Sequence, residues 1–374
     1  MSIIANKVTL GRVCLESNLF PVITLEINNV PTLFIKPFTD VDVRAIVEFV
    51  RDAANLYSGA GNTILFIDTP ITVGTVEAVE RLNAEGFRVV FRDHHGIDGE
   101  PTNDRDARVV AATAKLKHLL RSDCTITVRR LHPACSTLVR QGEFAGAVAI
   151  IADRDPDGLT AAMKAAGVSY PELDEDAAKL DGEPQNQVTG SAISQLLAKG
   201  MAVLPSYDSS RPKEREESQQ KLFSDWLQAV EGNKQARDRL ETRVLAYDEA
   251  VKTAQSLART GTEVAPGVVL VDATRKPLFD QGTLDALLES DPRYRIMVVR
   301  KSVGPIAAIH GIQYSMAVVK RHQDAINLHD LIPPQAKSDP EFGIISNVSF
   351  LLHTSEDIWN SQVLPALRVS FPVA

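Results

Sequence analysis

Three predicted strand ends in this sequence carry side chains that can bind a metal ion or transfer a proton. The run FRDHHG places Asp93, His94 and His95 where an apolar strand ends. The preceding strand, TILFID, ends on Asp68, and a later strand, GAVAIIAD, leads into the run RDPDG. Together the three ends supply two imidazoles and the five carboxylates of Asp68, Asp93, Asp153, Asp155 and Asp157.

Such a concentration of carboxylates favours a divalent metal site. Packed together without cations, the carboxylates would repel one another and be driven to protonate. Two divalent ions between them turn that repulsion into attraction, and mixed carboxylate and imidazole ligands suit Mn²⁺ better than Mg²⁺ or Fe. A pair of ions roughly 3.5–4 Å apart can activate water and stabilise the leaving oxygen of a phosphoryl group. The pattern therefore predicts two-metal hydrolysis of a phosphate ester.

Each strand end also has an ordinary structural explanation. An aspartate that ends a strand is usually a helix N-cap or a turn residue, and Asp68 precedes Thr69 and Pro70. The run DPDG is a common turn sequence, and two adjacent histidines can be a solvated surface pair. A cap or a turn readily explains an acidic residue at one strand end. Acidic residues at all three strand ends are much harder to attribute to caps and turns alone. The metal-site prediction therefore rests on the combination.

The segments around these residues alternate between strands and helices. Apolar runs typical of buried strands cover Thr63–Asp68, Phe87–His95 and Gly146–Asp153. Amphipathic stretches at helical spacing cover Val73–Gly86, Val109–Ser122 and Leu159–Gly167. Regular alternation of this kind predicts an α/β fold, a mostly parallel sheet with helices on both faces. Ligands of such sheets gather at the carboxyl ends of the strands, where the acidic side chains are expected.

The sequence changes character at Pro205. The run PSYDSSRPKEREESQQ is rich in charge and serine and has no apolar periodicity, which is typical of a linker. A long polar helical pattern follows over 221–259, and strand-like runs return at Ala265–Ala273, Tyr294–Ser302 and Met316–Arg321. We therefore expect a catalytic domain over residues 1–204, a linker and connecting helix over 205–262, and a smaller C-terminal α/β domain over 263–374.

The overall charge limits the class of substrate. The chain has 374 residues and a net charge of −8, whereas a protein that binds a long duplex through its phosphates is usually basic. The acidity favours a short or small phosphorylated substrate over a long one. Aromatic residues make up 6% of the chain, and they form no run interleaved with basic residues that could stack many successive bases.

Cysteine usage and the lack of long apolar segments indicate the compartment. Cys14, Cys124 and Cys135 show no metal-binding or disulfide spacing, which suits a reducing compartment and excludes a thiolate zinc site. The N-terminal segment lacks the features of a signal peptide, and no apolar run is long enough to span a membrane. We therefore expect a cytoplasmic protein without a membrane partner, and a homodimer stays open.

The DHH run at Asp93–His95, after a strand that ends in Asp68, resembles the DHH phosphoesterase superfamily. That family includes single-strand exonucleases, oligoribonucleases, cyclic-dinucleotide phosphodiesterases and manganese inorganic pyrophosphatases. The resemblance covers roughly the first two hundred residues and continues more weakly, by architecture, into the C-terminal domain. It implies two Mn²⁺ ions, with Asp93 bridging them and either His94 or His95 orienting or protonating the leaving oxygen. The implied metal ligands are Asp68, Asp93, His94, Asp153, Asp155 and Asp157.

The order of the motifs departs from that of the family. IADRDPDGLTAA is similar to the family's first motif, DxDxDG before a small-residue helix, yet it follows the DHH run here. One explanation is a circular permutation, which is reasonable where the termini of a domain lie close together. The other is a degraded first motif at FTDVDVRA, with Asp40 and Asp42. The permuted order is the better match, because LTAA follows DPDG whereas DVDVRA lacks the glycine.

The C-terminal domain lacks the glycine-rich GGGH motif with which the family's substrate domain holds a phosphate or terminal nucleotide. FGIISNVSFLLHTS occupies roughly that place with a single glycine, Gly343. Basic and hydroxyl side chains elsewhere in the domain are alternative anion contacts, although a solvated basic edge explains each of them as well. The predicted substrate-binding residues are Arg300, Lys301, Ser302, His310 and Arg321, with Arg300 the first choice.

Three functions are compatible with these residues. The first is a metal-dependent phosphodiesterase that hydrolyses short nucleotides or single-stranded nucleic-acid ends by a two-metal mechanism. The second is a phosphomonoesterase or pyrophosphatase, which the acidity favours slightly and the large second domain disfavours. The third is a catalytically inactive DHH-like scaffold in a nucleic-acid-processing complex, which the missing GGGH motif favours. Clustered carboxylates without a metal would cost stability, so the sequence favours the first function.

A cysteine nucleophile is a further hypothesis for the segment LHPACSTLV. His132 lies three residues before Cys135, and a Cys/His pair that is close in space can act in covalent catalysis. The run ACSTLVRQG is better explained as the start of a helix with Ser136 or Thr137 near its cap. The nucleophile hypothesis is therefore the weaker of the two.

Overall fold

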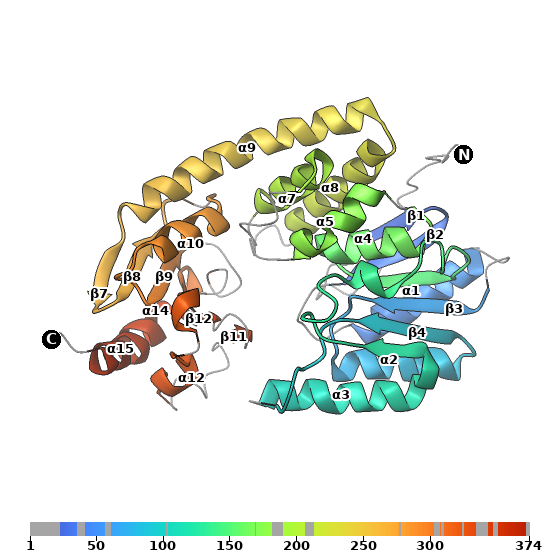
Figure 1. The fold of residues 1–374 in the computed structure, drawn as a ribbon, viewed down its shortest axis with the longest axis horizontal. Coiled ribbons are helices and arrows are strands. Elements are labelled where there is room, and N and C mark those ends of the chain that lie inside the picture. The colour runs from blue at the N-terminus through green and yellow to red at the C-terminus, as the bar shows by residue number, and fades with distance from the viewer. Residues whose placement is uncertain are drawn as a thin grey trace. The chain divides into compact units, whose positions relative to one another are not determined.

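The computed structural model describes residues 23–35, 42–56, 61–101, 104–168, 170–181, 190–205, 213–276, 278–302, 307, 310–323, 325–333, 343–346 and 351–371. Two compact units emerge from the contacts within the chain. Unit 1 comprises Met1–Ala198 and Gln219–Leu240, and unit 2 comprises Lys199–Ser218 and Glu241–Ala374. Each unit contains its own six-stranded sheet (Figure 1). The expected division into separate domains at residues 204 and 262 stays a prediction.

The sheet of unit 1 is parallel except at one edge. Its strands lie in the order β1-β2-β6-β3-β4-β5. β1 pairs antiparallel with β2, and the other neighbouring pairs are parallel. The strands are β1 Ile23–Ile27, β2 Val30–Ile35, β3 Thr63–Ile67, β4 Arg88–Asp93, β5 Cys124–Ile126 and β6 Ala149–Asp153. The predicted α/β fold with a mostly parallel sheet is confirmed, and the three strands with acidic ends are neighbours in it.

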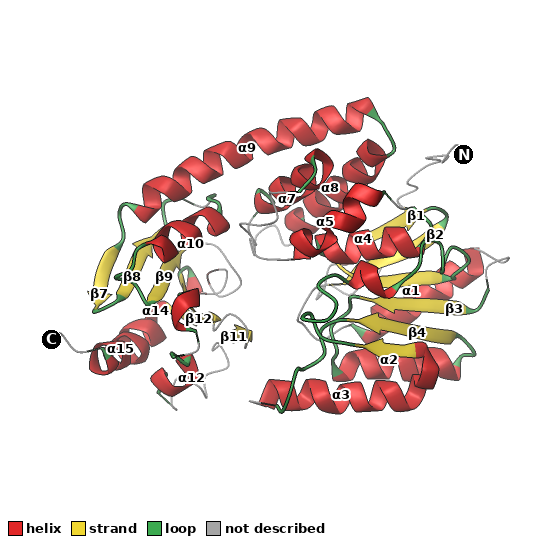
Figure 2. Cartoon of the chain, in the orientation of Figure 1, coloured by secondary structure: helices red, strands yellow, loops and turns green. Residues whose placement is uncertain are grey.

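Helices cover both faces of this sheet (Figure 2). Leu33 and Ile35 of β2 belong to an apolar core shared with three helices, α1 Val43–Leu56, α2 Val73–Ala84 and α3 Asp104–Leu120. Phe34 points to the opposite face, because successive strand residues alternate between faces. There its ring meets Phe223 of α8, Glu214–Val230, edge to face at 5.4 Å between centroids. Unit 1 also contains α4 Pro156–Ala165, α5 Pro171–Asp181 and the first part of α7 Ala192–Ala202.

Coverage on both faces explains the uninterrupted apolar sequences of the central strands. Every residue of β6 is buried, and in β3 only Thr63, at the start, is partly exposed. A strand with one solvated face would instead alternate apolar and polar residues. After Thr63, the next polar side chains of these strands therefore appear where the strands end.

The long helix predicted over 221–259 is two helices. α8 begins earlier than expected, at Glu214, so the charged run there is helical rather than part of a linker. α9, Lys234–Ala258, starts after a break at Gly232, whose φ of +92° is readily adopted by glycine. Asn233 then accepts a hydrogen bond from Ala236 N and caps α9. Neither α9 nor any other helix among the described residues is long and apolar enough to cross a membrane.

Unit 2 is built on a smaller, mostly antiparallel arrangement. Its strands lie in the order β11-β12-β10-β9-β8-β7. Among the described strands of this sheet, β8 and β9 form the parallel pair, and α10, Gln281–Ser290, connects them. The strands are β7 Thr262–Ala265, β8 Val268–Asp272, β9 Ile296–Lys301, β10 Gln313–Val318, β11 Gly343–Ser346 and β12 Leu351–Ser355. The expected second α/β domain is therefore present as a second sheet with helices.

The elements that follow β10 differ from the prediction. The strand expected over Met316–Arg321 starts earlier and ends at Val318, because Lys320–His322 form a 3₁₀ turn. Short helices complete the unit at α12 Leu328–Leu331, α14 Glu356–Ile358 and α15 Leu364–Ser370.

Asp176 of α5 fixes the start of α7. Its Oδ2 accepts a hydrogen bond from Ser191 N at 2.5 Å, and its Oδ1 accepts one from Lys179 Nζ at 2.9 Å. Burial raises the pKa of Asp176, but hydrogen bonds from Ser191, Lys179 and Ser194 outweigh burial and lower the pKa to about 2. The ionised carboxylate therefore stabilises the packing of α5 against α7.

We expect Asp176→Asn to lower the free energy of unfolding at pH 7 by about 2 kcal/mol, because it removes the charge that these donors stabilise. A lowered pKa gives stability that is present above the unfolded pKa of about 3.9 and is lost as the pH falls through the folded value. Urea unfolding should therefore show a difference between wild type and variant that is roughly halved at pH 3. Glu175→Gln, which removes a charge from the exposed neighbour, should show neither effect. A difference that stays constant with pH would contradict an ionic contribution.

Candidate metal centre

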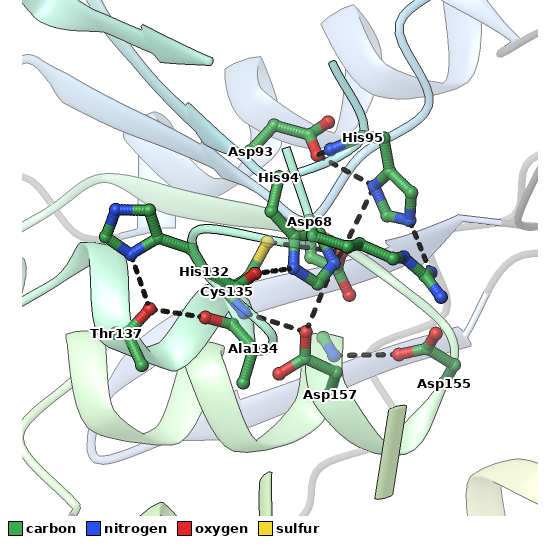
Figure 3. A network of polar contacts seen from close by, with 12 residues as sticks. Asp68, Asp93, His94, His95, His132, Ala134, Cys135, Thr137, Asp155 and Asp157 are labelled. Carbon is green, nitrogen blue, oxygen red and sulfur yellow. Dashed lines mark hydrogen bonds and ion pairs between the residues drawn. The ribbon is translucent and has the colours of Figure 1, made fainter. Parts of the chain in front are cut away.

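The three acidic strand ends meet at one edge of the unit 1 sheet. β6, β3 and β4 are parallel neighbours, so Asp153, Asp68 and Asp93 lie at the ends of adjacent strands. Backbone hydrogen bonds fix them further. Asp68 N donates to Arg92 O and Asp153 N donates to Asp68 O, both at 3.0 Å. The structure thus brings together the segments that the sequence singled out (Figure 3).

Asp68 lies at the centre of the cluster. Its backbone has a φ of +52°, which is uncommon for a residue other than glycine but tolerated by aspartate. Oδ1 lies 3.3 Å from Cys135 Sγ and 3.5 Å from both His94 Nε2 and His95 Nδ1. Oδ2 is buried and has no hydrogen-bond partner among the described residues. A buried carboxylate oxygen without a partner is what a bound cation would satisfy.

The predicted carboxylates act on one another electrostatically. Burial raises the pKa of Asp68 well above its ordinary value, and the charges of the other four carboxylates raise it further. Burial and the charge of Asp155 raise the pKa of Asp153 in the same way. Asp93 Oδ2, like Asp68 Oδ2, is buried without a hydrogen-bond partner in the described part of the chain. Positive charge at this edge would therefore stabilise the cluster.

His94 has the arrangement of a metal ligand. Its Nδ1 lies 2.7 Å from the carbonyl oxygen of His132, which only accepts, so Nδ1 carries the proton. Nε2 then turns its lone pair towards Asp68 Oδ1 at 3.5 Å and Asp157 Oδ2 at 3.6 Å. Burial, and secondarily the neighbouring His95, lower the pKa of His94 to about 4, so the ring is neutral at pH 7. A lone pair facing two carboxylates is repulsive unless a cation lies between them.

His95 is engaged at both ring nitrogens. Arg129 Nη2 donates to His95 Nε2 at 2.8 Å, so the ring proton is on Nδ1. That proton is directed to Asp93 Oδ1 at 2.7 Å, and the backbone N–H of His95 donates to the same oxygen. His95 therefore orients Asp93 and links it to the exposed guanidinium of Arg129. The sequence analysis did not single out Arg129.

The two aspartates at the start of α4 have different partners. Asp155 caps the helix through a hydrogen bond from Gly158 N to Oδ1 at 2.8 Å, as a turn sequence would suggest. Asp157 is fully buried, and its Oδ2 accepts from Cys135 N at 2.8 Å. Gly158 is required here, because a Cβ would lie 2.3 Å from Asp153 O. Asp155 is thus both a cap and a member of the cluster, since its charge raises the pKa of Asp68.

Cys135 joins the cluster although its spacing in the sequence gave no sign of this. It opens a 3₁₀ turn, Cys135–Leu138, in place of the expected helix start. Its thiol donates to Asp68 Oδ1, and burial together with the charges of Asp68 and Asp157 raises the thiol pKa well above its ordinary value. The ring of His132 instead contacts Thr137 Oγ1 at 3.0 Å. These contacts do not support the Cys/His nucleophile hypothesis.

The possible ligand atoms form two groups that share Asp68. One group contains Asp68, Asp93 and His95, and the other is Asp68, His94, Cys135 and Asp157. Within each group the atoms lie within 4.8 Å of one another. Asp68 belongs to both groups and Asp93 to one. The bridging role of Asp93 stays a prediction.

Only part of the alternative first motif lies within the described residues. Asp42 accepts a hydrogen bond from Ala45 N at 3.0 Å and so caps α1, while Asp40 lies outside the described residues. Asp157 lies beside His94 although the DPDG run follows the DHH run in the sequence. The choice between a permuted motif order and a degraded first motif stays a prediction.

Three of the predicted substrate-binding residues lie at the carboxyl end of β9 in unit 2 and have protein partners there. Arg300 forms ion pairs with Asp272 at 3.0 Å and Glu356 at 2.7 Å. Lys301 Nζ donates to Gln281 Oε1 at 2.9 Å, and Ser302 Oγ donates to Thr274 O at 2.8 Å. Their role in substrate binding stays a prediction.

The other two predicted residues of unit 2 lie elsewhere. Arg321 donates to the carbonyl oxygens of Glu289, Asp291 and Tyr294 at the end of α10. A substrate anion at Arg321 would have to displace these contacts, just as one at Arg300 would have to displace its ion pairs. His310 is exposed. Gly343 begins β11, and residues 347–350, in the segment compared with GGGH, lie outside the described residues.

Comparisons with known proteins add little to this geometry. No protein-family model matches the chain, and no curated protein sequence matches it. Among solved structures, the chain aligns with a pGpG-specific phosphodiesterase, PggH from Vibrio cholerae, with a TM-score of 0.35 and 11% identity. The alignment covers 80% of this chain and 95% of that chain. At this score it carries no argument about the site.

We expect Asp68→Asn to stabilise the metal-free protein by about 1–3 kcal/mol, because it removes a buried charge without an adequate partner. Asparagine tolerates the positive φ at this position. Mn²⁺ at about 100 times its Kd should stabilise wild type by about 2.7 kcal/mol and the variant much less. Thermal unfolding with EDTA and with MnCl₂ measures both effects. Asp42→Asn, at the α1 cap, should respond to Mn²⁺ as wild type does; an equal Mn²⁺ effect on the Asp68 variant would contradict a metal site here.

Proposed function

We propose that this protein is a metal-dependent phosphodiesterase that hydrolyses short nucleotides or single-stranded nucleic-acid ends at the unit 1 cluster. The arrangement of His94 supports this most directly. Its neutral ring is fixed by the His132 carbonyl and turns Nε2 towards two carboxylates, Asp68 and Asp157. A buried histidine with a backbone acceptor on its other nitrogen is typical of metal ligands.

The residues present fit two divalent ions. Asp68, His94, Cys135 and Asp157 would hold one, and the oxygens of Asp68 and Asp93 would hold the other, with Asp153 and Asp155 adding negative charge. Bound divalent ions would activate a water molecule and neutralise charge on the phosphoryl group. The ion that the oxygen ligands favour is Mn²⁺, with Mg²⁺ as the alternative.

The two histidines take different roles in this proposal. His94 is fully buried and acts as a ligand, so it cannot reach a leaving group. His95 is partly exposed, with 16% of its side chain accessible, and it holds a proton on Nδ1. We assign to His95 the positioning of Asp93 through that proton.

Arg129 is the proposed contact for the substrate phosphate. A cluster of carboxylates repels an anion, so a nearby cation from the protein is useful even when metal ions are bound. The exposed guanidinium of Arg129 lies 2.8 Å from His95 and is well suited to two hydrogen bonds with a phosphate. The acidic charge of the whole chain, −8, favours a short substrate over a long duplex.

The placement of the DPDG run beside the DHH run supports a permuted DHH-like site. β6 lies between β2 and β3, so the aspartates that follow it meet those of β3 and β4 at one edge. Chain order therefore matters less than strand order for assembling this site. A homodimer and a cytoplasmic location stay part of the proposal without a structural observation that bears on either.

Hydrolysis of a mixed panel tests the function. The panel holds single-stranded DNA and RNA oligomers, linear and cyclic dinucleotides, pyrophosphate and a generic phosphomonoester. Each is incubated with EDTA-treated protein, alone and after adding Mn²⁺, Mg²⁺ or Zn²⁺. We expect cleavage of a nucleotide phosphodiester that requires added metal and falls at least about 100-fold in His94→Ala, which loses a ligand.

His132→Ala is the matched control, because the ring of His132 lies against Thr137 and only its backbone carbonyl holds His94. Its activity should stay close to that of wild type. Turnover of pyrophosphate or the monoester alone would indicate the second function that the sequence allowed. No turnover of any compound, with no metal retained, would indicate the inactive scaffold.

Arg129→Met should raise KM and lower kcat/KM by about tenfold, because it removes a charge-assisted contact worth about 1.5 kcal/mol. The adjacent Arg130 pairs with Asp98 at the surface, and Arg130→Met should change neither value. Steady-state kinetics on the substrate found in the panel measure both variants. Equal effects of the two changes would mean a general loss of positive charge rather than a phosphate contact.

A further inference from the structure

We propose that the position formed by Asp68, His94, Cys135 and Asp157 is selective for Zn²⁺, with Cys135 bound as a thiolate, while the neighbouring position takes Mn²⁺ or Mg²⁺. This inference rests on the proposed function, since it concerns one half of the same centre. It assigns to Cys135 a role that neither its spacing in the sequence nor the family resemblance implies.

The donor atoms of the two positions differ in kind. The first offers a sulfur, an imidazole nitrogen and two carboxylate groups. Thiolate and imidazole ligands favour Zn²⁺, whereas carboxylate oxygens favour Mg²⁺ and Mn²⁺. The second position has Asp68 and Asp93, because both nitrogens of His95 are occupied by hydrogen bonds. The first position therefore suits Zn²⁺, and the second suits Mn²⁺ or Mg²⁺.

The spacing of the ligand atoms also suits Zn²⁺. Zn–N, Zn–O and Zn–S bonds of about 2.0–2.3 Å in a tetrahedron separate the ligand atoms by about 3.4–3.6 Å. Cys135 Sγ lies 3.3 Å from Asp68 Oδ1, and His94 Nε2 lies 3.5 Å from Asp68 Oδ1 and 3.6 Å from Asp157 Oδ2. Adjacent ligands of octahedral Mg²⁺, with bonds of about 2.1 Å, would lie closer, at about 3.0 Å.

The surroundings hold these ligand atoms in place. Cys135 N donates to Asp157 Oδ2 at 2.8 Å, so the turn that carries the thiol also orients a second ligand. The His132 carbonyl, three residues earlier, fixes the ring of His94. The segment from His132 to Cys135 thus positions three ligands. All four ligand residues are buried, and Asp68 Oδ2 has no hydrogen-bond partner among the described residues.

Binding of a metal ion at Cys135 exchanges the thiol proton for the ion. The S–H bond of Cys135, whose hydrogen now points to Asp68 Oδ1, breaks and a sulfur–metal bond forms. The proton leaves to solvent, and no electron is transferred. The site therefore needs a divalent ion and no other reactant.

Co²⁺ is the probe, because it replaces Zn²⁺ in such sites and a thiolate ligand gives it a near-ultraviolet charge-transfer band. The metal-free full chain is titrated with Co²⁺ while absorption is recorded and bound metal is counted by equilibrium dialysis. We expect the band in wild type and in Cys124→Ser, the matched control at a half-buried thiol of β5 outside both groups. Cys135→Ser should lose the band and bind Zn²⁺ at least about tenfold more weakly, with a much smaller change in Mn²⁺ binding measured without Zn²⁺.

A double variant, Cys14→Ser with Cys124→Ser, leaves Cys135 as the sole thiol and keeps the test decisive if Cys135→Ser does not fold. The band in this double variant supports the inference. Co²⁺ bound to wild type without the band overturns it and leaves the proposed phosphodiesterase standing. A wild-type protein that binds neither Co²⁺ nor Mn²⁺ overturns both.

Discussion

The mutual repulsion of carboxylates buried at adjacent strand ends is the constraint on which this site depends. Asp68, Asp93 and Asp153 cannot move apart, because parallel pairing and backbone hydrogen bonds through Asp68 fix their main chains. Burial raises the pKa of Asp68 and Asp153. Asp68 Oδ2 and Asp93 Oδ2 have no hydrogen-bond donor among the described residues. A cation is the direct way to offset this cost, and the neutral His94 turned into the cluster gives that cation a further ligand.

The same scaffold explains why the charges are buried at all. Helices on both faces exclude water from β3 and β6. The aspartates at the carboxyl ends of these two strands therefore follow directly after buried apolar residues. The start of α4 is drawn tightly against β6, and a side chain larger than that of Gly158 would collide with Asp153 O. This close approach brings Asp157 within hydrogen-bond distance of Cys135 N and beside the ring of His94. Fold stability and site assembly thus depend on one set of contacts.

Much of the site follows from the sequence, because parallel neighbouring strands bring their ends together whatever their order in the chain. Asp68, Asp93, His94 and Asp157 were found by that reasoning. Cys135 was missed, since its partners come from three distant segments and no local spacing marks them. Asp155 fits both the cap and the cluster. The break between α8 and α9 was missed although Gly232 and Asn233, residues that often end and begin helices, stand at it.

The sharing of Asp68 makes the two halves of the centre inseparable. One of its oxygens faces the sulfur and imidazole ligands as well as the ring of His95, which in turn orients Asp93 and meets Arg129. Any ion drawn towards Cys135 therefore changes the charge that Asp68 presents to the second position. Effects of replacing ligands on opposite sides should then be strongly non-additive, as is general for residues in one network. An asymmetric pair of ions, with the guanidinium on the oxygen-ligand side, would also define from which side an anionic substrate approaches.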